Sequence, residues 1–220
     1  MYYYKVIKTP EHIDNETFLR LLSEVSEQRR KKVLRYKFET GRIESLYAYL
    51  LLKDLLRKHY GITGNPVFEE GEHGKPHIVS LENENGNVDK NENSVTTTGN
   101  NASRNVFPYF NFSHCKTGIA CAVSDEPIGI DVERIGRNID ESLIRYVFND
   151  EEAEHVLASE KKSVEFTRLW TIKEALVKLT GTGIADEKQL KNLLTDTARY
   201  DFLTEVNENE AWVMTVAYEK

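Results

Sequence analysis

The sequence has few cysteines and no long apolar run, and each shortage excludes a class of protein. Two cysteines, Cys115 and Cys121, are too few for a disulfide framework and lack the spacing of a metal site. No stretch of eighteen apolar residues occurs, and the first ten residues lack the hydrophobic segment of a secretion signal. We therefore expect no membrane association and a cytoplasmic location.

The charge balance is also short of positive residues. Lysine and arginine number 29 against 36 acidic residues, which gives a net charge of −7. A protein that tracks nucleic-acid phosphates is normally basic, so we expect no nucleic-acid partner. With 220 residues, 40% of them hydrophobic, the chain is long enough for one domain or two small domains in close contact.

Helical and strand patterns alternate along the chain and predict an α+β or α/β fold. Strands are expected at 2–7, 67–70, 77–80, 110–115, 119–123, 128–132, 200–206 and 211–218, and helices within 14–60 and at 139–148, 150–158 and 164–179. Residues from about 81 to 105 are mostly Asn, Glu, Gly, Ser and Thr. This composition predicts a flexible insertion between two subdomains, 1–105 and 106–220.

Two acidic residues stand at the end of an apolar strand. Residues two apart in a strand point the same way, so Asp131 and Glu133 are expected to project together from one face. Two like charges at close range are unfavourable unless a cation such as Mg²⁺ neutralises them. The alternative is a solvated acidic strand end without a ligand.

A second group of polar residues lies on the helix predicted at 164–179. The helical period places Trp170, Glu174 and Lys178 on one stripe, with Lys173 on its flank. The alternative is a core tryptophan beside an ordinary surface ion pair.

Basic residues cluster between the two predicted amphipathic stretches near the N-terminus, at Arg29, Arg30, Lys31, Lys32, Arg35 and Lys37. This cluster is either a solvated helix face or a site for an anionic group, such as a phosphate or an acidic protein. Three carboxylates that gather Mg²⁺, together with lysines and a histidine, would suit a substrate that carries a pyrophosphate.

Four short motifs together resemble the Sfp-type 4′-phosphopantetheinyl transferases, of the holo-carrier-protein synthase superfamily. In chain order they are GKP (74–76), NFSH (111–114), GIDVE (129–133) and WTIKEALVK (170–178). GIDVE followed by WxxKEA is the specific part, whereas GKP and NFSH alone are not. The resemblance covers nearly the whole chain, although the segment at 81–105 is longer than this family leads us to expect.

The resemblance implies two pseudo-twofold-related α/β subdomains in one chain, and hence a monomer. It also implies an enzyme that transfers the 4′-phosphopantetheine group of coenzyme A to a serine of an apo acyl or peptidyl carrier protein, releasing adenosine 3′,5′-bisphosphate. Asp131, Glu133 and Glu174 would hold Mg²⁺, with Mn²⁺ as a possible substitute. Glu174, directly or through a metal-bound water, would deprotonate the serine, and Lys178 would stabilise the pyrophosphate.

The resemblance further implies a set of contacts to coenzyme A, at Arg29, Lys32, Ser45, Lys75, Pro76, Ser113, His114, Lys173 and Lys178. Two rival hypotheses remain at this point. One is a non-catalytic module of the same fold that binds coenzyme A or a carrier protein. The other is a Mg²⁺-dependent nucleotide hydrolase that uses the same acidic cluster. The carrier protein and its pathway are not specified by the sequence.

Overall fold

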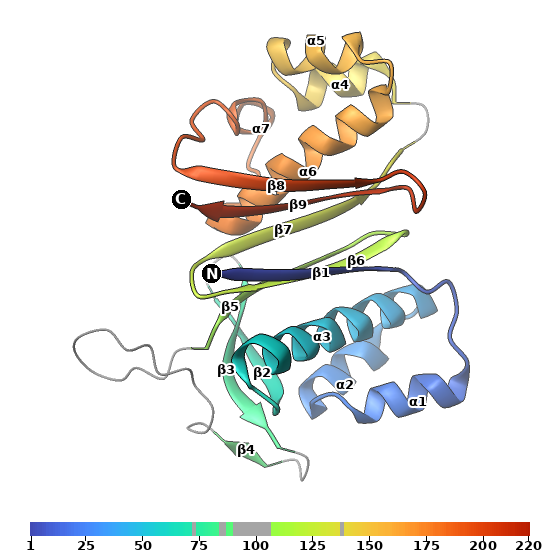
Figure 1. The fold of residues 1–220 in the computed structure, drawn as a ribbon. Helices are drawn as coiled ribbons and strands as arrows, with labels where there is room; N and C mark the ends of the chain where they lie inside the picture. Colours follow the sequence, from blue (N-terminus) through green and yellow to red (C-terminus); the bar gives the residue numbers. More distant parts are fainter. Residues whose placement is uncertain (72–73, 84–86, 90–106, 137–138) are drawn as a thin grey trace, which may run out of the picture.

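The computed structural model describes residues 1–71, 74–83, 87–89, 107–136 and 139–220. These residues form helices and strands in roughly equal number, arranged as three small antiparallel sheets with helices packed against them (Figure 1). This mixture confirms the α+β class. In the described part of the chain, no helix is both long and apolar enough to cross a membrane.

One half of the molecule is built on the sheet β1-β6-β5. Its strands are β1 (Tyr2–Lys8), β6 (Gly118–Ser124) and β5 (Tyr109–His114). The long helix α3 (Glu39–Tyr60) packs on this sheet, and its leucines share a core with Ile119 and Val123. The shorter helices α1 (Asn15–Ser23) and α2 (Glu27–Arg35) lie on the other side of α3 (Figure 1). A second small sheet consists of β2 (Asn65–Glu70), β3 (Pro76–Glu82) and β4 (Val88–Asp89).

The other half is built on the sheet β7-β9-β8. Its strands are β7 (Ile128–Arg134), β9 (Trp212–Glu219) and β8 (Tyr200–Asn207). Helix α6 (Lys162–Thr180) packs across it, and three further helices cover the far side of α6 (Figure 1). These are α4 (Glu141–Val147), α5 (Asp150–Ala158) and α7 (Glu187–Asn192). Strand β7 packs beside β5 and β6, which joins the two halves.

Local signals in the sequence account for several element ends. Asn149 and Glu152 form the predicted capping box at the start of α5, each side chain accepting a hydrogen bond from the other's backbone N–H. Gly61 ends α3 in the left-handed conformation, with φ of 68°. Helix α6 begins at Lys162, two residues earlier than the pattern at 164–179 predicts.

The predicted insertion at about 81–105 starts too early. Leu81 belongs to β3 and is 3% exposed, packed in the core beneath α3, because it pairs with β2 and faces inward. Most of the remaining insertion lies outside the described residues, as does the predicted boundary at 105/106. The strands β5 and β6 follow that boundary in the chain, yet β6 pairs with β1 as well as with β5, so hydrogen bonding crosses the boundary.

Candidate functional site

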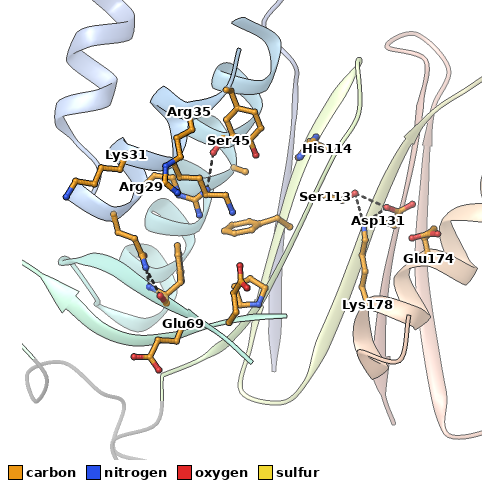
Figure 2. Close-up of a pocket in the computed structure, with 18 of the residues that line it drawn as sticks. Arg29, Lys31, Arg35, Ser45, Glu69, Ser113, His114, Asp131, Glu174 and Lys178 are labelled. Carbon is orange, nitrogen blue, oxygen red and sulfur yellow. Dashed lines mark hydrogen bonds and ion pairs between the residues drawn. The ribbon is translucent and has the colours of Figure 1, made fainter. Parts of the chain in front are cut away.

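A cavity of about 860 Å³ lies where the two halves meet (Figure 2). Helix α2 and strand β2 form one wall, β7 and α6 form the opposite wall, and β5 lies between them. The charged and polar residues around it are Gln28, Arg29, Lys31, Lys32, Arg35, Ser45, Glu69, Glu70, Ser113, His114, Asp131, Glu133, Glu174 and Lys178. A volume of this size accommodates a ligand larger than a mononucleotide.

The acidic wall arises because α6 lies very close to β7. A β-carbon added to Gly129 would fall 2.0 Å from the carbonyl oxygen of Ala175 and 2.6 Å from the backbone nitrogen of Leu179. Only glycine therefore allows this contact between strand and helix. It brings Asp131 of β7 and Glu174 of α6 to the same end of the cavity (Figure 2).

The carboxylates of this wall are electrostatically unfavourable to one another. Burial raises the pKa of Glu174, and the charge of Asp131 raises it further. Burial also raises the pKa of Glu133, again with a contribution from Asp131. The indole N–H of Trp170 donates to Oε1 of Glu133 at 3.4 Å, which opposes part of that shift. A cation among these side chains would relieve the repulsion.

Asp131 is the most buried of the three carboxylates, at 2% exposure. Its Oδ1 lies 2.6 Å from the ammonium of Lys178 and accepts a hydrogen bond from Ser113 Oγ at 2.8 Å. Lys178 also donates to Ser113 Oγ at 2.9 Å. The other carboxylate oxygen of Asp131, Oδ2, is buried without a hydrogen-bond partner. An orphaned carboxylate oxygen in a pocket is an available ligand position.

The side chains as they stand do not form a closed metal site. Among the residues the structure describes, no group of three His, Cys, Asp or Glu side chains is gathered closely enough to hold an ion. The chemistry of the donors nevertheless fits a hard divalent cation. Asp131, Glu133 and Glu174 offer only oxygen ligands, and Asp131 Oδ2 has no other partner.

The opposite wall is cationic, and Arg29 lies deepest in it. Arg29 is 6% exposed, donates to Ser45 Oγ at 3.1 Å and lies 5.0 Å from the ring centre of Tyr49 and 5.3 Å from that of Phe68. Burial lowers its pKa. In the described part of the chain no carboxylate pairs with Arg29. A buried guanidinium without a counterion, facing a cavity, suits an anionic ligand.

The rest of the cationic wall comes from α2 and β5. Lys31, Lys32 and Arg35 line the cavity from α2 (Figure 2). Desolvation lowers the pKa of Lys32, and the charge of Arg29 lowers it further. His114 of β5 lies 3.4 Å from Glu44. Four members of the basic cluster thus line the cavity: Arg29 is buried, whereas Lys31, Lys32 and Arg35 are exposed to solvent.

Lys75, the predicted phosphate contact, is held against the end of α6. The ammonium of Lys75 donates to the backbone carbonyls of Lys178 at 2.7 Å, Leu179 at 3.2 Å and Ile128 at 3.4 Å. The last carbonyls of a helix lack partners within the helix, and Lys75 satisfies those at the end of α6. Pro76 does line the cavity.

The prediction for Lys173 is contradicted. Its side chain is fully buried on the far side of α6 from the cavity, 2.7 Å from Glu152 of α5. Consecutive helical residues point about 100° apart, so Lys173 cannot share the face of Glu174. Burial lowers the pKa of Lys173, against the effect of Glu152.

The sequence reasoning missed the aromatic floor and the second acidic group of the cavity. Phe68, Phe112 and Tyr36 line it, together with Glu69 and Glu70. Phe112 lies within the NFSH motif between two of its polar members, which is a signal that could have been used. No such signal in the sequence marked Phe68, Glu69 and Glu70 of β2, because a register shift between Val67 and Phe68 changes which side chains face the cavity.

Comparison with known proteins gives matches of one kind. Residues 127–215 match the model of the 4′-phosphopantetheinyl transferase superfamily. The chain is 29% identical over 181 residues to 4′-phosphopantetheinyl transferase gsp of Aneurinibacillus migulanus, covering 81% of this chain and 65% of that protein. It is 25% identical over 175 residues to 4′-phosphopantetheinyl transferase Sfp of Bacillus subtilis strain 168, covering 78% and 66%.

A shorter match has a higher identity. Over 92 residues the chain is 41% identical to 4′-phosphopantetheinyl transferase HetI of a Nostoc species, covering 40% of this chain and 39% of that protein. In all three comparisons the chain spans less than two thirds of the relative's own length.

Proposed function

We propose that the chain is a member of the 4′-phosphopantetheinyl transferase superfamily, which it resembles in sequence, and that it transfers 4′-phosphopantetheine from coenzyme A to a serine of an apo acyl or peptidyl carrier protein. The observation that carries the proposal is the pairing of opposed walls in one cavity. The cationic wall on α2 would hold phosphate groups, and the acidic wall on β7 and α6 would surround the reacting pyrophosphate (Figure 2).

Binding is the task of the cationic wall. Arg29, Lys32 and His114, with the hydroxyl of Ser45, would hold the anionic groups of coenzyme A. Arg29 is already fixed by Ser45 and by the aromatic rings around it, so little rotamer freedom would be lost when a phosphate binds. The low polarity around its guanidinium would strengthen the attraction.

The acidic wall would serve the reacting atoms. Asp131, Glu133 and Glu174 would hold Mg²⁺, or Mn²⁺, which when bound neutralises charge on the pyrophosphate. Glu174 would accept the proton of the carrier serine, and its raised pKa makes it a stronger base than an exposed glutamate. Lys178, hydrogen-bonded to Ser113, would place its positive charge on the pyrophosphate.

The bonds and charges of this reaction balance. The serine oxygen bonds to the β-phosphorus of coenzyme A, and the bond from that phosphorus to the bridging oxygen breaks. The proton goes to Glu174, and adenosine 3′,5′-bisphosphate leaves with the bridging oxygen. Phosphoryl transfer depends mainly on positioning and charge neutralisation, and these are the two tasks that the named side chains would perform.

We also propose the subunit arrangement that goes with this function. Both walls of the cavity come from one chain, so a monomer would be complete. Each half carries a three-stranded sheet with a long helix, α3 in one and α6 in the other, which agrees with a pseudo-twofold relation of two subdomains. The cytoplasm, where coenzyme A and carrier proteins meet, is the proposed location.

The test is the intact mass of an apo carrier protein after incubation with the full chain, coenzyme A and Mg²⁺. We expect a gain of one phosphopantetheine group, abolished by EDTA and by Glu174→Ala. No gain on acyl and peptidyl carriers alike, with coenzyme A still bound, would favour the non-catalytic binding module. That alternative is favoured by one observation: among the described residues, the three carboxylates are not gathered closely enough to hold an ion. Cleavage of coenzyme A without a carrier would indicate a hydrolase.

A further inference from the structure

Lys173 is a fully buried lysine whose hydrogen-bonding capacity is used up within the protein. A lysine ammonium has three N–H donors. In this structure they reach three acceptors: Glu152 Oε2 at 2.7 Å, the carbonyl of Leu190 at 2.8 Å and the carbonyl of Val147 at 3.3 Å. No donor is left for a phosphate, and none of the side chain is exposed.

The three acceptors come from three different helices. Val147 is the last residue of α4, Glu152 lies in the first turn of α5, and Leu190 lies in the last turn of α7. The ring of Phe148, directly after α4, lies 5.1 Å from the same ammonium. Lys173 therefore joins α6 to the three other helices that the described residues form in this half of the molecule.

Glu152 links this contact to the local structure of α5. Its Oε2 also accepts the backbone N–H of Asn149 at 3.1 Å, and the Asn149 side chain donates to the carbonyl of Lys191 at 3.3 Å. The carboxylate that neutralises Lys173 thus also caps α5. A buried pair with all its hydrogen bonds satisfied specifies one arrangement of the helices around it.

The opposite face of α6 carries Glu174 and Lys178, which line the cavity. There the backbone of α6 lies close to β7 beside Gly129, and Lys178 contacts Asp131. Lys173 is adjacent to Glu174 in sequence, and its contacts fix the side of α6 that faces away from the cavity. A rotation of the helix that moved Glu174 would break them.

Taking the proposed transferase function as given, we propose that Lys173 is a positioning residue. It locks the rotation of α6 against α4, α5 and α7, so that Glu174 and Lys178 face the reacting pyrophosphate. It does not itself touch coenzyme A. A misplacement of about 1 Å in a reacting group can cost about 10²-fold in rate, so a small rotation is enough to matter.

The experiment uses the full chain with Lys173→Met, Glu152→Gln and the double variant. Methionine keeps the length of the side chain beside Phe148, and glutamine keeps an oxygen for the Asn149 N–H. Lys162→Met, an exposed lysine on the same helix, is the matched control. Three quantities are measured: the Tm, the kcat and KM for coenzyme A well below the Tm, and backbone hydrogen exchange over residues 172–178.

We expect Lys173→Met to lower kcat by about tenfold or more, with KM for coenzyme A changed by less than about twofold. It should also lower the Tm and speed exchange in α6, because Glu152 is left buried without its counterion. The double variant should recover much of the kcat, of the Tm and of the protection from hydrogen exchange, since it removes both charges. Lys162→Met should match the wild type.

Three results would overturn the proposal. A folded Lys173→Met with full kcat would show that the residue positions nothing. A rise in KM that is equal in the single and double variants, with an unchanged Tm, would indicate direct contact with coenzyme A. A lower Tm with unchanged kcat would leave only a structural role.

Two further situations are covered by the same set of variants. If Lys173→Met does not fold, the double variant decides, by its kcat and KM. If the wild type transfers nothing, the proposed function fails by itself, and hydrogen exchange in α6 still tests whether Lys173 and Glu152 act as a pair.

Discussion

The ammonium of Lys178 lies 2.6 Å from Oδ1 of Asp131, and this contact joins α6 to β7 at the acidic end of the cavity. The Asp131 side chain is 3% exposed and that of Lys178 is 27% exposed. A buried carboxylate needs a positive partner, and in this structure Lys178 supplies it. The proposed divalent cation would need the same carboxylate, so the lysine and the cation share Asp131.

Lys178→Met should therefore make folding depend on a divalent cation. Without a cation we expect the free energy of unfolding to fall by about 3 kcal/mol, the lower end of the range for breaking a buried pair, because Lys178 is partly exposed. Adding Mg²⁺ should then raise the Tm of the variant more than that of the wild type. Thermal unfolding with and without Mg²⁺ measures both effects, with Lys162→Met as the control. Equal Mg²⁺ shifts in the two proteins would contradict the sharing of Asp131.

The raised pKa of Glu174 gives a pH-dependent prediction. Between the ordinary value of 4.5 and its higher value in the fold, the folded chain binds more protons than the unfolded chain. The contribution of Glu174 to the free energy of unfolding therefore falls as pH rises through that window. Above the window, the ionised Glu174 destabilises the fold by its full amount.

Glu174→Gln removes this cost. Without divalent cations, the variant should have a higher Tm than the wild type at pH 7, and the difference should shrink as the pH approaches 4.5. Carrier modification should be lost at every pH, because the proton acceptor is gone. Thermal unfolding across this pH range is the measurement. A lower Tm than the wild type at pH 7 would show that Glu174 stabilises the fold.

Local patterns in the sequence predicted the parts of the molecule that depend on local structure. The alternation of side chains in β7 predicted a shared face for Asp131 and Glu133, and the helical period of α6 predicted a shared stripe for Glu174 and Lys178. All four line one cavity, but their meeting there depends on the packing of α6 against β7. The capping box of α5 is also local and appeared as predicted.

Non-local contacts account for the errors. Lys173 looked available because it flanks Glu174 in the motif, yet its partners come from α4, α5 and α7, whose packing no periodicity reveals. The contact of Lys75 with the end of α6, about a hundred residues further along the chain, is equally invisible in local patterns, and its phosphate role stays a prediction. The aromatic rings around Arg29 come from α3, β2 and β5, so their meeting depends on the tertiary fold.

Lys32→Met tests the cationic wall. We expect KM for coenzyme A to rise by about tenfold, the equivalent of one charge-assisted hydrogen bond, with kcat little changed. The wild-type KM should also rise with salt, and that rise should be smaller in the variant. Steady-state kinetics at two salt concentrations gives both numbers. Lys37→Met is the control, since Lys37 belongs to the basic cluster but not to the cavity wall. A similar rise in KM for both variants would mean that only the general charge of the basic cluster matters.

Gly129→Ala tests whether the close approach of α6 to β7 builds the acidic wall. The added methyl would fall 2.0 Å from the carbonyl oxygen of Ala175, a backbone atom that can move only if the whole helix moves. We expect a loss of stability of about 1–3 kcal/mol or more from overpacking, and a larger relative loss of kcat because Glu174 and Lys178 are carried away from Asp131. The control is Gly136→Ala, whose added methyl would meet, among the described residues, the side chain of Ile139 at an ordinary 3.5 Å. Tm and kcat are measured for both variants at a temperature where both are folded. If Gly129→Ala is destabilised but keeps the kcat of the wild type, the geometry of the acidic wall does not depend on this contact, and α6 must be positioned by its other face alone.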